Sequence, residues 1–216
     1  MITFHIVTLF PEVMEPYLNS SIIGRGIESK KLAVRFYNPR DYLERPGDRA
    51  DGKPFGGGPG MVIRPEPVIK AVEKAKGTKK GVKLVLFDRK GRRLTNNYAH
   101  ELSKRYRHIV MICGRYEGVD ARVYDVFKEE DIQRVSMGSF ILTGGEIPAL
   151  ALVDCVSRQI PGVLGDPNSL EESRPAGRAV YTRPASFSHK GKIHSVPKIL
   201  LSGHHAKIEN WRDKRS

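Results

Sequence analysis

Three glycine-rich loops hold the residues of this 216-residue chain whose types and spacing could bind a ligand. They read RPGDRADGKPFGGGPGM at 45–61, CGRYEGVD at 113–120 and SMGSFILTGGEIP at 136–148. Glycine has no Cβ atom, so a ligand can closely approach its main-chain N–H and C=O groups. The third loop surrounds such groups with apolar side chains, which suits a planar, adenine-like base read by main-chain hydrogen bonds.

The first loop matches neither of the common phosphate-binding patterns. Its consecutive glycines are not followed by Lys-Ser/Thr, and they lack the spacing of a dinucleotide-binding turn. A flexible surface loop is the alternative, in which Asp48 and Asp51 would serve as turn residues. In the second loop, Arg115 and Glu117 could form a surface ion pair instead of contacting a ligand. No single loop therefore identifies its ligand.

The elements that must position these loops alternate between strand and helix. Strands are predicted at 2–9, 32–38, 83–87 and 108–113, and helices at 65–76, 96–106 and 119–127. A strongly apolar helix is predicted from Ile147 to Ile160, directly after the turn Gly144-Gly145. This alternation predicts an α/β fold with a largely parallel sheet flanked by helices. Ligands of such sheets bind beyond the carboxyl ends of the strands, beside which these loops lie.

The charge of the chain favours a polyanionic partner. Lys and Arg number 37 against 24 Asp and Glu, which gives a net charge of +13. Residues 174–216 hold ten of these cations against two acids, and a second basic run, DRKGRR, spans residues 88–93. Solvated charge is the ordinary explanation of one such run. Two runs together with a pI near 9.8 favour nucleic acid.

Cysteine content and hydropathy exclude several classes of protein. Cys113 and Cys155 lie far apart, so neither a disulfide framework nor a zinc site is indicated. No segment approaches the roughly 20 continuous apolar residues of a membrane span, and the N-terminus meets Pro11 and acidic residues too early for a signal peptide. We therefore expect a reduced, cytoplasmic protein without a membrane partner.

The composition of the sequence changes after Gly162. Residues 163–180 lack apolar periodicity and are rich in Gly, Pro, Ser and charge, which predicts a flexible linker. Further on, Ile199, Leu200, Ile208 and Trp211 are spaced for a short amphipathic helix. Residues 181–216 are therefore expected to form a small, basic, helical region.

Taken together, the motifs resemble one family. The stretches RPGDRADGKPFGGGPGMV, CGRYEGVDARV, SMGSFILTGGEIPALALVDCVSRQIPGVLG, YTRP and LLSGHHAKIENWR follow the order and nearly the spacing of the bacterial TrmD-type tRNA (guanine-N1)-methyltransferases. The resemblance runs from the N-terminal LFPE to Arg212. Their combination is far more specific than any one glycine loop.

The resemblance implies a fold, a reaction and partners. It implies a SPOUT methyltransferase domain over residues 1–162, with a deep trefoil knot at its C-terminal end, which composition alone would not suggest. It implies methyl transfer from S-adenosylmethionine to N1 of guanosine 37 of tRNA, in a homodimer whose active sites take residues from both subunits. Residues 181–216 resemble the beginning of the family's C-terminal tRNA-binding domain, so we expect a shortened version of it.

The resemblance also assigns residues to the two ligands. Those expected to bind the methyl donor are Phe87, Gly91, Cys113, Gly114, Tyr116, Glu117, Ser136, Met137, Gly138, Phe140, Leu142, Gly144, Gly145 and Pro148. Those expected to bind the tRNA substrate are Asp51, Gly57, Gly58, Pro59, Met61 and His204. No metal ligand set is predicted, although the resemblance is compatible with a requirement for Mg²⁺.

Methylation at guanine N1 requires a proton acceptor, because N1–H is a weak acid. In the family, the carboxylate that acts as the general base lies in an acidic stretch of the linker, which here reads SLEESRP. Glu172 aligns with that base if one residue is deleted upstream, and Ser173 aligns with it if no gap is made. A hydroxyl cannot accept the proton at neutral pH, so we assign Glu172. Arg158 is expected to stabilise negative charge that develops on guanine O6.

Two departures from the family pattern affect this transfer of roles. Residues 87–91 read FDRKG where the family has LSPQG, and Ser139 replaces a common Asp. Two other functions are alternatives to guanine N1 methylation. A SPOUT ribose 2′-O-methyltransferase would need no N1 base and would lack the combined GGGPGM and GRYEG loops. A non-enzymatic RNA-binding protein of this fold would keep the donor pocket but transfer no methyl group.

Overall fold

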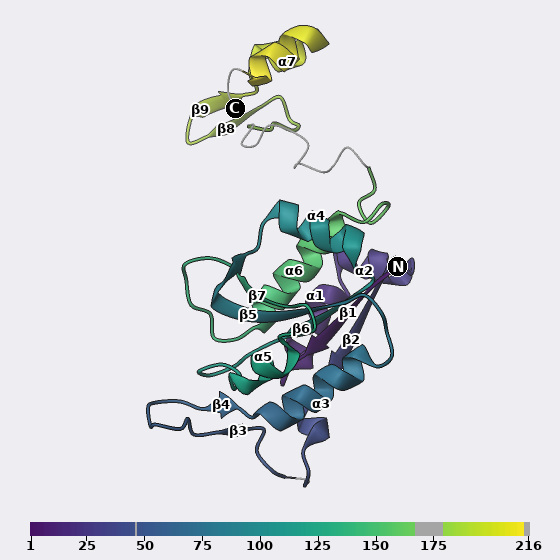
Figure 1. The fold of residues 1–216 in the computed structure, drawn as a ribbon. Coiled ribbons are helices and arrows are strands. Elements are labelled where there is room, and N and C mark those ends of the chain that lie inside the picture. Colours follow the sequence, from purple (N-terminus) through teal and green to yellow (C-terminus); the bar gives the residue numbers. More distant parts are fainter. Residues whose placement is uncertain (46, 167–178, 214–216) are drawn as a thin grey trace. The chain divides into compact units, whose positions relative to one another are not determined.

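The computed structural model describes residues 1–45, 47–166 and 179–213 of the chain (Figure 1). The chain divides into two compact units, a first unit over Met1–Pro167 and a second unit over Asn168–Ser216. Glu172 lies outside the described residues. Among those that are described, no helix has the length and apolar character needed to cross a membrane.

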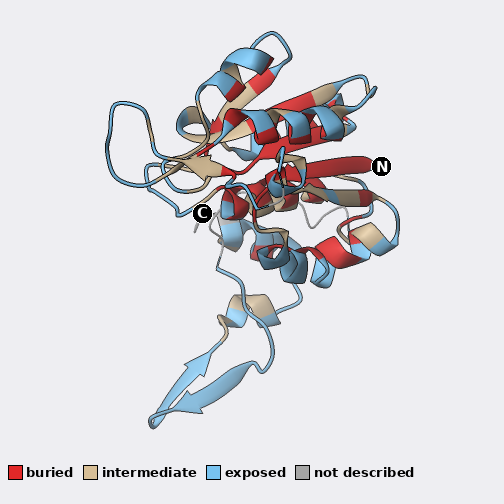
Figure 2. Ribbon diagram, turned by 90° about the horizontal axis from the view of Figure 1, so that it is seen from below, coloured by how far each residue is buried: buried red, intermediate tan, exposed pale blue. Residues whose placement is uncertain are grey.

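A five-stranded, all-parallel sheet forms the centre of the first unit. Its strand order is β2-β1-β6-β5-β7. The strands are β1 Ile2–Val7, β2 Leu32–Tyr37, β5 Val82–Arg93, β6 His108–Ile112 and β7 Ile132–Ser136. Every residue of β1 is buried, because helices cover both faces of a parallel sheet. Figure 2 shows this central burial in red.

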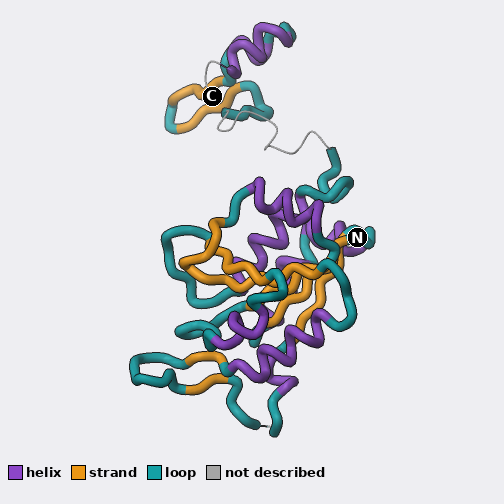
Figure 3. The backbone as a smooth tube through the Cα atoms, viewed as in Figure 1, coloured by secondary structure: helices purple, strands orange, loops and turns teal. Residues whose placement is uncertain are grey.

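Helices cover the two faces of the sheet and separate two apolar cores. One face carries α1 Glu15–Leu18, α2 Ser21–Glu28, α4 Asn96–Arg105 and α6 Glu146–Arg158, and the other carries α3 Pro65–Lys76 and α5 Arg122–Phe127 (Figures 1 and 3). Ile2, Phe4 and Ile6 of β1 belong to the first core, whereas Val7 belongs to the second. The predicted parallel α/β sheet flanked by helices is confirmed.

Several elements differ from the sequence prediction. The helix predicted at 65–76 matches α3 at both ends, and α4 and α6 lie within two residues of the predicted bounds. Strand β5, expected to end at residue 87, continues to Arg93 through the basic run DRKGRR. Its register against β7 shifts between Phe87 and Arg92. A bulge of this kind lets polar residues continue a strand that leaves the core.

The helices α1 and α2 and the strand β7 were not predicted. Helix α2 contains Gly24 and Gly26, which disfavour a helix by propensity. Both are buried at close contacts, because a Cβ atom on Gly24 would lie 2.6 Å from the carbonyl oxygen of Asn19, and one on Gly26 would lie 2.7 Å from Leu32. Close packing therefore explains why α2 contains two glycines although glycine has a low helix propensity.

The second unit contains a β-hairpin as well as the expected helix. Strands β8 Ser186–His189 and β9 Lys192–Ser195 pair antiparallel, a 3₁₀ turn follows at Lys198–Leu201, and α7 spans His205–Asp213. Lys190 and Gly191 both have positive φ, of 50° and 75°, as a two-residue type I′ hairpin turn requires. The expectation of a purely helical region is therefore wrong for residues 186–195.

Two very short strands complete the first unit. Strands β3 Asp51–Gly52 and β4 Val62–Ile63 pair antiparallel at the base of the glycine-rich loop 53–61. The 3₁₀ turns at Pro11–Val13 and Pro39–Tyr42 follow β1 and β2. The other two glycine-rich loops directly follow β6 and β7, at the edge of the sheet where parallel α/β folds bind ligands.

Candidate active site

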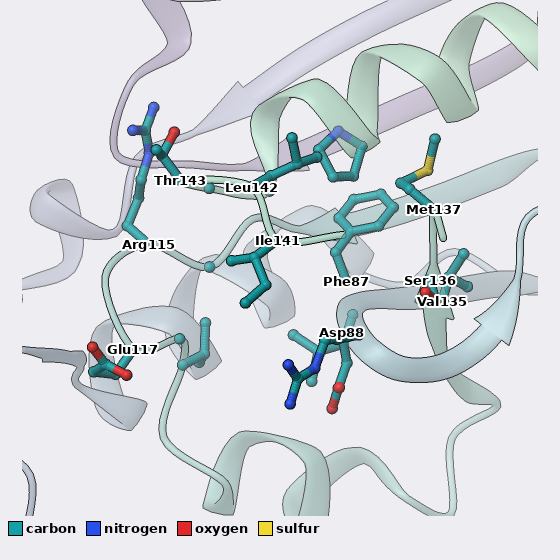
Figure 4. Close-up of a pocket in the computed structure, with 18 of the residues that line it drawn as sticks. Phe87, Asp88, Arg115, Glu117, Val135, Ser136, Met137, Ile141, Leu142 and Thr143 are labelled. Atoms are coloured by element: carbon teal, nitrogen blue, oxygen red, sulfur yellow. The ribbon is translucent and has the colours of Figure 1, made fainter. Parts of the chain in front are cut away.

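A cavity of about 470 Å³ lies at the carboxyl ends of three neighbouring strands. Its walls are the bulged part of β5, the loop after β6 and the loop after β7. Figure 4 shows Phe87, Ile141 and Leu142 on one side of the cavity, with the carboxylates of Asp88 and Glu117 toward the other. A cavity of this size with mixed apolar and main-chain polar walls suits a nucleoside-sized ligand.

Twelve of the fourteen residues predicted for the methyl donor line this cavity. They are Phe87, Gly114, Tyr116, Glu117, Ser136, Met137, Gly138, Phe140, Leu142, Gly144, Gly145 and Pro148. Nine further lining residues were not predicted to bind the donor: Leu86, Asp88, Arg89, Arg115, Gly118, Val119, Val135, Ile141 and Thr143. All nine fall inside or next to predicted motifs, so their neighbours in the sequence were the available signal.

Gly91 and Cys113 are not among the lining residues. A Cβ atom on Gly91 would lie 2.5 Å from the backbone of Arg134 and Val135, so this glycine permits close strand packing behind the cavity. Cys113 is 3% exposed, and burial raises the pKa of its thiol well above the usual value. Both residues shape the wall from behind.

The glycine turn at 144–145 joins two walls of the cavity by backbone contact. The Gly145 amide donates to the carbonyl oxygen of Gly114 at 2.8 Å, and Gly144 forms an antiparallel bridge with Arg115. A Cβ atom on Gly145 would lie 2.5 Å from the Cα atom of Cys113. The two glycines are therefore required for loop-to-loop packing, whatever ligand the cavity holds.

Glu146, the first residue of α6, is a buried carboxylate at the centre of a polar cluster. It is 3% exposed, accepts a hydrogen bond from the Thr8 hydroxyl at 2.7 Å, and pairs with Arg115 Nε at 2.9 Å. The Arg115 guanidinium also lies 4.6 Å from the ring centroid of Phe10, a cation–π distance. Arg115 therefore forms its ion pair with Glu146 and not with Glu117. The sequence did not predict this ion pair.

The loop after β6 carries backbone strain at the cavity. Tyr116 has a φ of 61° and its side chain is 53% exposed. A bulky residue adopts this left-handed conformation only where the surroundings enforce it, and such residues cluster at ligand sites. Here the Arg115–Glu146 ion pair on one side and the bond from the Gly118 amide to the Arg115 carbonyl oxygen at 2.9 Å enforce it.

The loop 53–61 is tied to the cavity wall at its C-terminal end. The Glu117 amide donates to the Met61 carbonyl oxygen at 3.0 Å, and the Ile63 amide donates to the Gly118 carbonyl oxygen at 3.0 Å. The predicted substrate residues Gly57, Gly58 and Pro59 lie in the exposed part of this loop. There Phe55 is 98% exposed.

The predicted substrate residue Asp51 lies at the base of the loop, in β3. It pairs with Arg49 at 2.9 Å. The pairing holds Asp51 at the start of the loop.

Of the two predicted catalytic residues, the structure describes Arg158, and this residue does not line the cavity. Arg158 is half-buried at the last position of α6, twelve residues after Glu146, which corresponds to roughly 18 Å along the helix axis. His204 belongs to the second unit. One copy of the first unit therefore does not bring Arg158 to the cavity.

Two acids of the first unit, Asp154 and Asp166, could also accept a proton. Asp154 on α6 accepts a hydrogen bond from the Tyr17 hydroxyl at 2.5 Å, and this bond raises the pKa of Tyr17 to about 12. Asp166 is exposed. Within residues 1–45, 47–166 and 179–213, no three His, Cys, Asp or Glu side chains are grouped to hold a metal ion.

Comparisons with known proteins show the family of the chain. The family model "tRNA (Guanine-1)-methyltransferase TrmD" matches residues 2–216. A tRNA (guanine-N(1)-)-methyltransferase of Buchnera aphidicola is 40% identical over 220 residues, covering 100% of this chain and 90% of the relative. Proteins of the same name are 42% identical in Ruminiclostridium cellulolyticum, with 99% and 90% covered, and 44% identical in Caldanaerobacter subterraneus, with 99% and 86% covered. Because the family model covers nearly its whole length and the relatives are 40–44% identical to it, the chain belongs to the TrmD family of tRNA (guanine-1)-methyltransferases.

Proposed function

We propose that this protein transfers a methyl group from S-adenosylmethionine to N1 of guanosine 37 in tRNA. The observation that carries the proposal is the cavity of about 470 Å³ at the carboxyl ends of β5, β6 and β7. Family membership supplies the reaction, and the net charge of +13 suits a polyanionic substrate. The deep trefoil knot remains our expectation for the loops around this cavity.

The residues of the cavity fit the methyl donor. Phe87, Leu142 and Pro148 offer apolar surface for an adenine ring, while the glycine turns offer main-chain donors and acceptors. Bound there, S-adenosylmethionine would supply an electrophilic methyl group on its sulfonium. The chain's own residues would orient this group toward the guanine and exclude water.

The chain must also remove the proton from guanine N1. We assign this step to the carboxylate of Glu172, with Arg158 donating to O6 as negative charge develops there. Mg²⁺ is an expectation from the resemblance, and we assign it no ligands. The cytoplasmic location likewise stays a prediction.

We further infer that the active form is a homodimer. Leu152, Val153 and Val156 of α6 pack inside their own chain, so most of this apolar helix needs no partner. However, Ile147 is 60% exposed, and Phe140 and Ile141 of the neighbouring loop are 56% and 79% exposed, which favours a covered surface. The separation of Arg158 from the cavity within one chain also favours a site completed by a second copy.

The base assignment is tested by replacing Glu172 with Gln. Single-turnover methyl transfer should fall roughly 10²–10⁴-fold, while affinities for S-adenosylhomocysteine and tRNA stay near wild type. Glu171→Gln is the matched control for loss of linker charge and should transfer at nearly the wild-type rate. If Glu171→Gln is damaging and Glu172→Gln is silent, the alignment is off by one residue. If both are silent, the proton acceptor is another acid, with Asp166 and Asp154 next.

The homodimer is tested by sedimentation at micromolar concentration. We expect a dimer in the wild-type protein and a weakened one in Ile147→Glu, because a charge would be buried in the interface. A stable wild-type monomer that still transfers methyl groups would contradict the shared active site.

A further inference from the structure

The β-hairpin of the second unit has two chemically different faces. In its register, Phe187 pairs with His194 and His189 pairs with Lys192, while Ser186 pairs with Ser195 and Ser188 with Ile193. Because side chains alternate along a strand, Phe187, His189, Lys192 and His194 share one face. We call this the aromatic face. Serines and Ile193 form the opposite face.

The aromatic face presents a stacked pair of rings to solvent. The rings of Phe187 and His194 are stacked, with centroids 5.3 Å apart and an interplanar angle of 18°. Phe187 is nevertheless 58% exposed, and every residue of β8 and β9 is exposed (Figure 2). The pair supports the hairpin across its strands, but it does not bury the phenylalanine in a core. An aromatic surface therefore remains open to a ligand.

The hairpin is also uniformly basic. Residues 186–195 contain Lys190, Lys192 and two histidines but no acidic residue. Lys192 lies on the aromatic face beside the ring pair, and Lys190 lies in the turn. Exposed aromatic rings flanked by cations are the usual means of binding unpaired nucleotides, because bases stack on the rings and phosphates contact the cations.

We propose that the aromatic face of the hairpin binds tRNA by stacking an unpaired base on the Phe187–His194 pair, with Lys190 and Lys192 contacting the adjoining phosphates. This proposal rests on the proposed function for its partner and adds a contact in the second unit. The stacking makes the contact selective for unpaired nucleotides. The lysines contribute affinity that depends on salt.

The test compares variants of the two faces in filter binding to tRNA without methyl donor. Phe187→Leu keeps an apolar cross-strand residue but removes the ring, and it should weaken tRNA affinity roughly 5- to 100-fold. Phe187→Trp should restore it. The matched control is Ile193→Ala on the opposite face, because Ile193 is 76% exposed. This control should bind tRNA like wild type.

Two further measurements separate stacking from charge. A fully paired RNA duplex should bind Phe187→Leu and wild type equally, because it offers no unpaired base. Lys192→Gln should reduce the slope of log affinity against log salt by about 1. Equal tRNA affinities of Phe187→Leu and wild type, or the same loss on duplex and tRNA, would overturn the stacking proposal.

This test does not depend on the proposed reaction. Filter binding reports the hairpin contact even if the wild-type protein transfers no methyl group, and such a failure would count against the proposed function alone. Conversely, wild-type transfer with unchanged affinity in Phe187→Leu would overturn only the hairpin contact.

Discussion

The glycine turn of the first unit and the hairpin of the second unit are both short and rich in small or polar residues, yet they are held in opposite ways. At the turn, backbone packs on backbone, with Gly145 against Cys113 and Gly114, and the buried Glu146 ties it to Arg115. In the hairpin, all eight strand residues are exposed. The glycine turn therefore fixes the shape of the cavity wall, whereas the hairpin presents side chains to solvent.

The difference predicts how each region responds to substitution. A change at the turn alters the cavity wall, because no space exists there for additional atoms. A change on the hairpin alters only what the surface can contact. Stability and donor binding should therefore follow the turn, whereas tRNA affinity should follow the hairpin.

The largest effect is expected at Gly145. Gly145→Val places a Cβ atom 2.5 Å from the Cα atom of Cys113, so the two walls must separate and binding of S-adenosylhomocysteine should fall below detection by calorimetry. The control is Gly165→Val, because Gly165 has open space within 4 Å and no positive φ. Wild-type donor affinity in a folded Gly145→Val protein would show that backbone packing at the turn does not shape the donor cavity.

The next largest effect is expected at Glu146. Glu146→Ala leaves Arg115 without its carboxylate, and since Arg115 is 24% exposed the free energy of unfolding should fall by about 2–3 kcal/mol in urea titrations, below the full value for a buried pair. Glu66→Ala is the control, because its ion pair with Arg64 is long, at 3.8 Å, and exposed. That variant should change stability by less than about 0.5 kcal/mol. Equal losses in the two variants would remove the distinction between buried and exposed pairs.

The stability of the first unit should depend on pH through His5. His5 is fully buried in β1, and its ring nitrogens form hydrogen bonds with the Tyr37 hydroxyl and with His108. Burial lowers the pKa of His5 from 6.5 to about 4. The unfolded chain therefore binds more protons between these values, so the free energy of unfolding should decline as pH falls from about 6.5 to about 4. His5→Asn should flatten this decline. A wild-type stability that is constant over this range would contradict the assignment.

The smallest effect is expected from the hairpin on stability. Phe187→Leu should change the free energy of unfolding of the protein by less than about 1 kcal/mol, because a cross-strand pair contributes little. Thermal unfolding followed by circular dichroism measures it. A larger loss would mean that the ring is a structural support, and would weaken the comparison with the glycine turn.

Sequence patterns predicted the parts of the fold that local periodicity controls. Helix α3 and the strands β1, β2 and β6 have clear hydrophobic patterns, and the structure places them within two residues of the predicted bounds. Helix α2 was missed because Gly24 and Gly26 oppose it locally and tertiary contacts favour it. The β8–β9 hairpin was missed because exposed strands carry no apolar alternation.

The candidate site was predictable only in part for a similar reason. Two of the glycine-rich motifs bring residues to one cavity, but the Glu146–Arg115–Thr8 cluster joins positions far apart in the chain, such as Thr8 and Glu146. No spacing rule links such residues. Gly91 and Cys113 were expected at the ligand and lie behind the wall, since a motif marks constrained backbone without saying which atoms face the cavity.

The proposed reaction is tested by methyl transfer from labelled S-adenosylmethionine to unmodified tRNA transcripts that carry either guanosine or adenosine at position 37. We expect incorporation into the guanosine transcript, with the label recovered as N1-methylguanosine, and none into the adenosine transcript. Incorporation into both transcripts, recovery of the label on a ribose, or no transfer by a protein that binds S-adenosylhomocysteine would contradict it.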